Sequence, residues 1–347
     1  MRDDERLHRL LRQVAPGTPL REGIENVLHA GTGGLIVLGD GPEVLALAAG
    51  GFDMDCPFSP ANLYELSKMD GAIILTADAR RIVRANVQLV PDPGVPSVET
   101  GIRHRSAERV SRQTGATVVA VSQRRRQVTL YQGTLRHVLR DAAQVLGRAN
   151  QGLGALERQR MALVAEISDL DRVEFSGEVT LADVAAAVQR FALLDRIARE
   201  VSGYVEELGT EGRLVAMQLH ELTRSLSEEI HYVLRDYASD SSLDHARSLR
   251  EQLAAWSAEA LLDLTAVARS LGQSGELEQV VAPRGLRMLR RVPRLPPPVA
   301  DKLAQQFGTL ARLLGASLEE LDAVEGIGAA RALAIRRHLA RLREVAR

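Results

Sequence analysis

The sequence predicts an α/β domain, with a mixed or antiparallel sheet covered by helices, followed by two all-α segments. Short apolar runs bounded by turn residues are concentrated in about the first 135 residues. Helical periodicity dominates from there to about Gly272, and a proline-rich stretch, PRLPPPVADKL, then precedes a last helical segment punctuated by glycines. Because three consecutive prolines do not fit inside a helix or sheet, this stretch marks a boundary. We expect domains at 1–138, 139–283 and 284–347.

Composition restricts the class of protein. The 347 residues carry 44 Lys and Arg against 45 Asp and Glu, so any attraction to nucleic acid must come from a local patch. Cys56 is the single cysteine, which excludes an intramolecular disulfide and favours a small, buried apolar role in a reducing compartment. No signal peptide and no apolar run long enough for a membrane span is present. We therefore expect a cytoplasmic protein without a membrane partner.

The first segment supplies the sheet. The runs GGLIVLGD and EVLALAAGG predict two buried strands joined by a turn at Asp40–Pro42, and Ser59 with Pro60 begins a short helix. Further strands are expected at Ala72–Leu75 and Ile82–Leu89, and in TGATVVAVSQ and RQVTLYQG, with a helix from about Arg103 to Gln113. Strands joined by short turns, with helices between some of them, predict a mixed or antiparallel sheet.

The second segment is helical from about Leu135. A capping box, Thr180 with Asp183, begins a helix whose apolar residues recur at helical spacing. His220 and His231 have no acidic or cysteine partner at metal-ligand spacing, so we interpret both as ordinary surface or interface histidines. This segment predicts a bundle or spine without chemistry of its own.

The third segment contains SLEELDAVEGIGAARALAIRRHL, in which two helices flank Gly326-Ile327-Gly328. The glycines allow a tight turn, so that N–H groups at the start of the second helix can bind a phosphate oxygen. Residues 284–347 hold 13 Lys and Arg against 6 Asp and Glu, an excess of 7. The pattern resembles a helix-hairpin-helix motif and predicts DNA binding through the backbone, with a simple turn between packing helices as the alternative.

Two glycine-containing stretches of the first segment are candidate nucleotide-binding sites, and the pattern supports only the second. GTGG at Gly31–Gly34 precedes a strand and lacks a following Lys-Ser/Thr, so it is interpreted as a turn rather than a phosphate loop. MDGAIIL places Asp70 at the mouth of a strand, where a carboxylate can hold a divalent cation while Gly71 and Ala72 let a nucleotide approach the backbone. The alternative is that Asp-Gly is only a turn.

The stretch VETGIRHRSAERV concentrates positive charge at a helix entrance, beside the anion-binding end offered by Thr100 and Gly101. In a continuous helix Arg103 and Arg105 would lie about 200° apart, so they could not grip one polyphosphate. Either the triplet lies in a non-helical cap or it serves two partners. Arg105, Arg109 and Arg112 would continue as one basic stripe, and a solvated basic turn is the alternative.

Together DGAIIL, NVQLVPD, ETGIRHRSAER, TVVAVSQ and VTLYQG resemble the diadenylate cyclase domain. With the helical spine and the helix-hairpin-helix segment, the whole chain is similar to the DNA integrity scanning protein family. Ser106 stands where many relatives have threonine, and Gln123 stands where an acidic residue is common.

The resemblance implies condensation of two ATP molecules to cyclic di-AMP. Asp70 would bind Mg²⁺ or Mn²⁺ and help to activate the ribose 3′-hydroxyl, and Leu89 would pack on the adenine or its sugar. Asp70, Arg103, His104 and Arg105 would be catalytic. The nucleotide would be held by Gly71, Ala72, Leu89, Thr100, Ile102, Arg103, His104, Arg105, Ser106 and Ser122.

The same resemblance implies partners. Branched or junction-like DNA would be bound without sequence specificity by Gly326, Ile327, Gly328 and Arg331, placing the protein at the nucleoid. Two cyclase domains are expected to meet face to face, because a symmetric product needs a symmetric site, and the resemblance implies assembly into a homo-octamer. Two rival functions remain: a scaffold that only senses ATP or cyclic di-AMP, and a helix-hairpin-helix nuclease, for which clustered carboxylates are missing.

Overall fold

The computed structural model describes the backbone of residues 2–346 and the side chains of those residues other than 2–5 and 225–227. The chain forms two compact units. One comprises Met1–Asn150 with Ser202–Ala216, and the other comprises Gln151–Val201 with Met217–Arg347. No helix of the described part of the chain is both long enough and apolar enough to cross a membrane.

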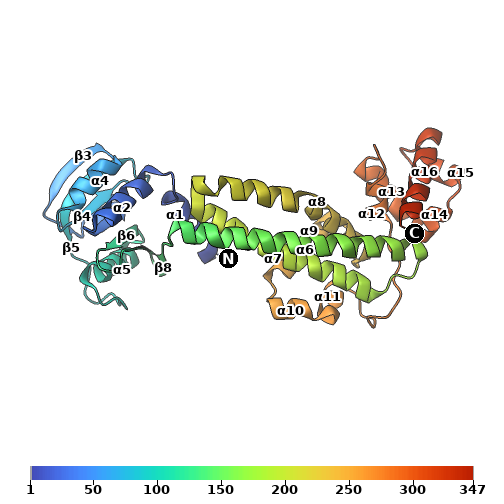
Figure 1. The fold of residues 1–347 in the computed structure, drawn as a ribbon, viewed down its shortest axis with the longest axis horizontal. Helices are drawn as coiled ribbons and strands as arrows, with labels where there is room; N and C mark the ends of the chain where they lie inside the picture. Colours follow the sequence, from blue (N-terminus) through green and yellow to red (C-terminus); the bar gives the residue numbers. More distant parts are fainter. Residues whose placement is uncertain (1, 347) are drawn as a thin grey trace. The chain divides into compact units, whose positions relative to one another are not determined.

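The first unit is built on an eight-stranded sheet (Figure 1). Its strand order is β2-β5-β4-β1-β6-β7-β8, with β3 paired to β5. Only β1 and β4 run parallel among the pairings described, which confirms the expected mixed sheet. The strands are β1 Gly34–Leu38, β2 Ala48–Ala49, β3 Phe52–Pro57, β4 Ala72–Leu75, β5 Arg81–Leu89, β6 Thr117–Ser122, β7 Gln127–Gln132 and β8 Leu135–Val138.

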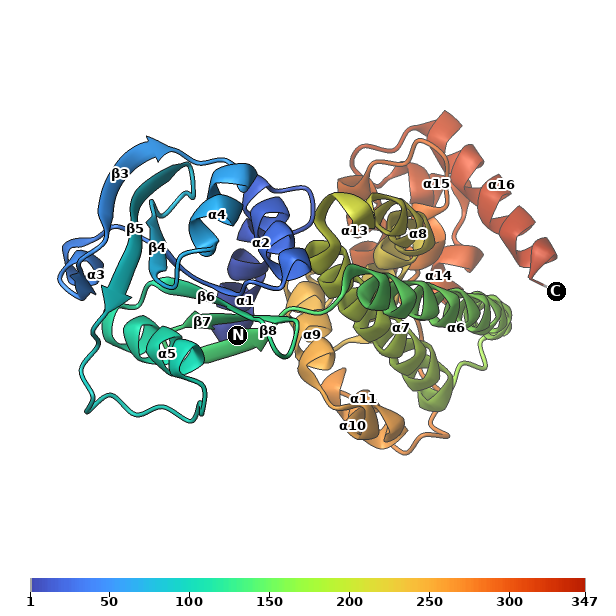
Figure 2. The ribbon, with the colours of Figure 1, turned by 60° about the vertical axis from the view of Figure 1, so that its left-hand side comes forward.

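Helices cover both faces of this sheet (Figure 2). Alternate residues of β1 enter different apolar clusters, Ile36 on one face and Val37 on the other, as the period of a strand requires. The first cluster contains side chains of α1 (Arg2–Gln13), α2 (Pro19–Ala30) and α4 (Pro60–Ser67). The second contains side chains of α3 (Pro42–Leu45) and α5 (Ile102–Thr114).

Four features of this unit differ from what the sequence predicted. EVLALAAGG does not form one buried strand, because Pro42 begins the short helix α3 and only Ala48–Ala49 pair as strand β2. Strand β3 was missed because its aspartates and Pro57 are typical of a turn, although its apolar residues alternate with polar ones as in a strand. Helix does not begin near Leu135, since Gly133, at a φ of +60°, turns the chain into strand β8. Cys56 in β3 is half-buried rather than buried.

The helices that follow confirm the predicted all-α character. Thr180 and Asp183 form the expected capping box: the Thr180 amide donates to Asp183 Oδ2 at 2.8 Å, and the Asp183 amide donates to Thr180 Oγ1 at 3.3 Å. The helices are α6 Ala142–Ser176, α7 Leu181–Leu208, a 3₁₀ turn Gly209–Gly212, α8 Arg213–Tyr237, α9 Leu243–Ala255, α10 Ala258–Leu262 and α11 Leu264–Ser270.

The C-terminal helices share one apolar core with the end of α6. This core runs from Leu286 to Leu339 and includes Phe175. The proline run lies in the segment that forms this core, but the three prolines are exposed: Pro296 caps α13, and the next two prolines form its first turn, where a missing N–H costs nothing. These helices are α12 Leu286–Arg290, α13 Pro297–Phe307, α14 Leu310–Gly315, α15 Leu318–Asp322 and α16 Ala329–Val345.

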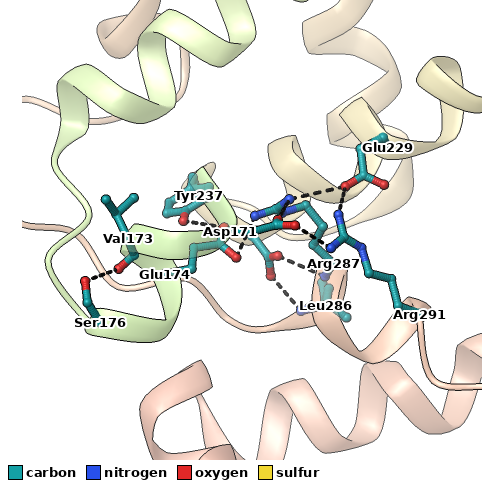
Figure 3. Close-up of polar contacts among 10 residues, drawn as sticks. Asp171, Val173, Glu174, Ser176, Glu229, Tyr237, Leu286, Arg287 and Arg291 are labelled. Carbon is teal, nitrogen blue, oxygen red and sulfur yellow. Dashed lines mark hydrogen bonds and ion pairs between the residues drawn. The ribbon is translucent and has the colours of Figure 1, made fainter. Parts of the chain in front are cut away.

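A buried cluster of charges joins α12 to α6 and α8 (Figure 3). Arg287 is only 1% exposed and makes ion pairs with Asp171, with Glu174 at 2.7 Å and with Glu229 at 3.2 Å. The buried Asp236 carboxylate accepts the amides of Leu286 at 2.7 Å and Arg287 at 2.9 Å, which fixes the start of α12. Part of the positive charge counted in the third segment is therefore neutralised inside the protein.

Candidate active site

Two adjoining clefts lie at the N-terminal turn of α5 and share Ile102 and Arg103. The Gly101 cap makes no side-chain hydrogen bond, so the first N–H groups of this helix remain available to an anion. One cleft, of about 470 Å³, is lined by Leu35, Asp70, Gly71, Ala72, Val87, Gln88, Leu89, Ile102, Arg103 and Ser106. The other, of about 540 Å³, is lined by Glu99, Thr100, Gly101, Ile102, Arg103, His104, Ser122, Gln123, Arg124 and Arg125.

Asp70 stands at the entrance to β4 with a side chain that is 99% exposed. Its Oδ1 accepts from Arg103 Nη2 at 3.2 Å. No group of three or more His, Cys, Asp or Glu side chains able to hold a metal occurs among the described residues. A single accessible carboxylate fits Mg²⁺ or a similar ion, which usually combines one or two carboxylates with substrate phosphates and water.

Gly71 has a structural reason to be glycine. A Cβ on Gly71 would lie 2.4 Å from the Asn86 backbone, where Asn86 adopts a φ of +53° and the pairing of β4 with β5 shifts register. Strand β5, which passes close to Gly71, is therefore what excludes a side chain at this position. Gly71 and the neighbouring Ala72 nevertheless line the cleft beside Asp70.

Gly33 also leaves no room for a side chain, and here the space is filled by a residue of the site. At a φ of +73° a Cβ on Gly33 would lie 2.6 Å from Arg103 Nη1. Gly31 ends α2 in the left-handed conformation, so the GTGG stretch is the turn expected from the sequence. Its contact with Arg103 was not foreseen, because nothing local in the sequence connects a turn after α2 with α5.

The Arg-His-Arg triplet is helical throughout, since α5 begins at Ile102. Its three side chains accordingly have three partners. Arg103 contacts Asp70, His104 Nδ1 lies 2.9 Å from the Tyr131 hydroxyl, and Arg105 donates to the Thr100 carbonyl at 3.0 Å. The sequence left two alternatives, a non-helical cap or separate partners for the arginines, and the structure agrees with the second. Arg105 lines neither cleft, whereas Arg103 lines both.

The expected basic stripe of α5 is not a free surface. Arg109 Nε donates to the Val95 carbonyl at 2.9 Å, and Arg112 donates to the buried Glu108 carboxylate at 2.7 Å. Glu108 also accepts from Ser97 Oγ at 2.6 Å. With Arg105, these residues hold the segment before α5, which carries Glu99 and Thr100 into the second cleft. Glu108 was missed because a charged residue in a helix normally faces solvent.

The β6–β7 hairpin completes the second cleft. The Arg125 amide donates to Ser122 Oγ at 3.3 Å, and Gln123, Arg124 and Arg125 line the cleft with Ser122. Arg124 and Arg125 were not foreseen, because a basic run in a hairpin usually indicates only a solvated turn.

The second unit contains the expected hairpin between α15 and α16. Gly326 has a φ of +90°, and the Arg331 side chain donates back to its carbonyl. Gly328 caps α16 without a side-chain hydrogen bond, which leaves N–H groups at the helix start for an anion. Ile327 is 8% exposed and packs in the core. The hairpin therefore offers backbone amides at Gly328 and an exposed Arg331, with Ile327 as an anchor.

Comparisons with known proteins cover the three segments in order. Family models match residues 21–135 (DisA bacterial checkpoint controller nucleotide-binding), 139–280 (DisA bacterial checkpoint controller linker region) and 293–344 (helix-hairpin-helix motif). The DNA integrity scanning protein DisA of Symbiobacterium thermophilum is 54% identical over 343 residues, covering 99% of this chain and 97% of the relative. That of Carboxydothermus hydrogenoformans is 48% identical, covering 98% of each chain. A crystal structure of DacA from Staphylococcus aureus matches 40% of this chain and 89% of that chain, with 21% identity and a TM-score of 0.29.

Proposed function

The chain belongs to the DNA integrity scanning protein DisA family and is a diadenylate cyclase, and we propose that it condenses two ATP molecules into cyclic di-AMP. Each ribose 3′-hydroxyl attacks the α-phosphate of the other ATP, each hydroxyl loses its proton, and two pyrophosphates leave. The observation that carries this proposal is the junction of two clefts at the N-terminus of α5, with Asp70 and Arg103 in contact there.

Each side chain has a task in this proposal. Arg103 and the amides at the start of α5 offset the charge that builds up on phosphorus and the leaving group. Leu89 and Ala72 offer apolar surface to the adenine or ribose. Ser106 lines the same cleft, and Thr100 and Ser122 line the neighbouring one, where polyphosphate oxygens would find hydroxyl donors.

The Asp70 carboxylate would hold the divalent cation, Mg²⁺ or Mn²⁺. When bound, such an ion supplies Lewis acidity toward the phosphates and the attacking hydroxyl. Asp70 Oδ1 accepts from Arg103 Nη2, which keeps the guanidinium next to the carboxylate that would hold the cation, where it can also reach a phosphate.

A symmetric product requires two sites related by symmetry. We propose that two cyclase domains meet face to face, each holding one ATP, within a homo-octamer. Ile102, which lines both clefts and is 84% exposed, and Val98, which precedes the cleft residue Glu99 and is 79% exposed, offer apolar surface for such a contact.

The hairpin between α15 and α16 would bind branched or junction-like DNA through backbone phosphates. Its amides at Gly328 and the exposed Arg331 contact no base in this proposal, so recognition is of shape and charge. Binding of such DNA would place the protein at the nucleoid.

The experiment is to incubate the purified protein with ATP and Mn²⁺ and to separate the products by chromatography. Cyclic di-AMP and pyrophosphate are expected in a ratio of one to two. Unchanged ATP after incubation with Mn²⁺, and in a second incubation with Mg²⁺, would contradict the proposal and favour a scaffold that only senses the nucleotide.

A further inference from the structure

A chain of polar side chains runs from His104 into the interior of the sheet domain. His104 Nδ1 lies 2.9 Å from the hydroxyl of Tyr131, a residue of β7 that is 1% exposed. The Tyr131 hydroxyl donates to Glu99 Oε1 at 2.8 Å, and Arg136 Nε donates to the same oxygen at 2.7 Å. The chain joins a cleft residue to a fixed carboxylate.

The hydrogens of this chain can be assigned. Burial would raise the pKa of Glu99, but the hydrogen bonds from Arg136 and Tyr131 outweigh it and hold the pKa below its usual value. Glu99 is therefore an acceptor only. Burial and the Glu99 carboxylate raise the pKa of Tyr131, so its hydroxyl keeps its one hydrogen, which Glu99 accepts. The Tyr131 oxygen can then only accept, and His104 Nδ1 must donate.

This assignment also determines the hydrogen-bonding role of the other ring nitrogen of His104, Nε2. Burial lowers the pKa of His104 below its ordinary value, although the Glu99 carboxylate opposes the shift. A neutral imidazole with hydrogen on Nδ1 has a lone pair on Nε2. Nε2 is buried and has no hydrogen-bond partner within the described part of the chain, while His104 lines the second cleft. An unpaired buried nitrogen beside a cleft points to a partner supplied by a ligand.

We propose that Tyr131 and Glu99 are positioning residues that hold His104 as the Nδ1–H tautomer, with Nε2 as an acceptor for the bound nucleotide. The inference rests on the cyclase reaction proposed above. It makes His104 chemically different from its two neighbours. Arg103 and Arg105 are permanent cations that only donate hydrogen bonds. His104 Nε2 instead accepts a hydrogen bond from the bound nucleotide, and it cannot donate one while the ring is neutral.

The test begins with Tyr131→Phe, which removes one hydroxyl, and with Tyr64→Phe as the matched control. Tyr64 lies on α4 of the same domain and lines neither cleft. Initial rates of cyclic di-AMP formation are measured at several ATP concentrations. For Tyr131→Phe we expect kcat to fall roughly 10- to 100-fold with a smaller change in KM, which is the size of effect seen when the group that orients a metal-bound histidine is removed. Tyr64→Phe should behave as the wild type.

A double-mutant cycle separates positioning from folding. If Tyr131 acts through His104, Tyr131→Phe should cost little further activity in a His104→Ala background. If Tyr131 only supports the sheet, Tyr131→Phe should reduce activity by the same factor in the His104→Ala background as in the wild type. The second result would overturn the inference.

Glu99→Gln gives an independent readout, the acidic limb of the pH–rate profile. The charged groups that face His104 are Glu99, Arg103, Arg125 and Arg136, and of these only Glu99 raises the histidine pKa. Removing that charge should lower the pKa of His104, so the acidic limb of the residual activity should move to lower pH. An acidic limb at the wild-type position would contradict the inference.

The outcomes distinguish this inference from the function on which it rests. If the wild-type protein forms no cyclic di-AMP, the proposed cyclase function itself is contradicted. An active wild type with an equally active Tyr131→Phe variant would leave the cyclase reaction in place and overturn the role of the tyrosine.

Discussion

Arg103 and Asp70 are in direct contact, Nη2 to Oδ1 at 3.2 Å, although they are 33 residues apart and belong to a helix and to the entrance of a strand. The Asp70 side chain is 99% exposed and the Arg103 side chain 32% exposed. An exposed pair of this kind contributes little to stability. Its value lies in placing a cation-binding carboxylate and a phosphate-binding guanidinium at one point of the cleft.

Asp70→Asn should abolish cyclic di-AMP formation, with a loss of about 100-fold or more, because an amide is a poor ligand for a hard cation. The melting temperature should not change, since the side chain is exposed. Asp40→Asn, at another exposed aspartate of the same domain, is the control. Product formation by Asp70→Asn at the wild-type rate would exclude the metal role.

Gly33→Ala should impair turnover by displacing Arg103, because the added Cβ would lie 2.6 Å from Nη1. Gly31→Ala is a matched control: Gly31 has a similar φ of +68°, but no atom lies within 4 Å of its added Cβ. Both variants should lose about 1–2 kcal/mol of unfolding free energy through left-handed strain. Only Gly33→Ala should lower kcat/KM, and equal kinetics in the two variants would show that Gly33 does not position Arg103.

Local sequence patterns were sufficient for most of the fold. Buried runs such as Ala72–Leu75 and the capping box at Thr180 gave the correct elements, because periodicity and caps are properties of neighbouring residues. The stretch FDMDCP of strand β3 has the alternation of a strand, but its two aspartates and Pro57 are also typical of a loop, so the local pattern did not decide between the two.

The candidate site was predictable to a similar extent. Asp70 and Arg103 were identified by motif resemblance, and the structure brings them together. Gly33 and Tyr131 were not identified, because each matters through a contact with a residue far away in the sequence. The basic stripe was misread because sequence shows the charge of Arg109 but not the Val95 carbonyl that binds it.

Arg287→Met should destabilise the second unit by about 3–5 kcal/mol at pH 8, because it leaves Glu174 and its neighbours buried without their cation. Arg290→Met is the control, since Arg290 is half-exposed and pairs with the exposed Glu228 at 3.4 Å. Its effect should stay within about 1 kcal/mol. Chemical denaturation followed by circular dichroism would measure both.

The loss in Arg287→Met should depend on pH. Burial raises the pKa of Asp236 to about 7 from an ordinary 3.8, and it raises the pKa of Glu174 as well. A raised folded-state pKa gives stability that is complete below the unfolded-state value and is lost as the pH rises through the folded-state value. Without Arg287 both pKa values should rise further, so the variant should be closer to the wild type at pH 5 than at pH 8. A loss independent of pH would contradict this account.

DNA binding by the hairpin is best tested at a single position, because the C-terminal core extends from Leu286 to Leu339 and includes Phe175. A chain ended near Val292 would divide that core, so it would report on folding as well as on DNA. Gly328 is suitable, since its φ is −116° and a Cβ would meet no atom within 4 Å.

Gly328→Asp should weaken binding of branched DNA roughly tenfold at low salt, because it places a carboxylate where a phosphate would meet the start of α16. Aspartate is a favourable N-cap, so the helix should not be destabilised. Gly315→Asp adds the same charge at an open position at the end of α14, outside the turn between α15 and α16, and should bind DNA nearly as the wild type does. Both variants should form cyclic di-AMP normally without DNA. If junction-like DNA lowers synthesis by the wild type, only Gly328→Asp should lose that response at moderate DNA concentrations, since an effector that binds less tightly shifts the enzyme less. A Gly328→Asp variant that bound and responded to DNA like the wild type would show that the hairpin is not the DNA sensor.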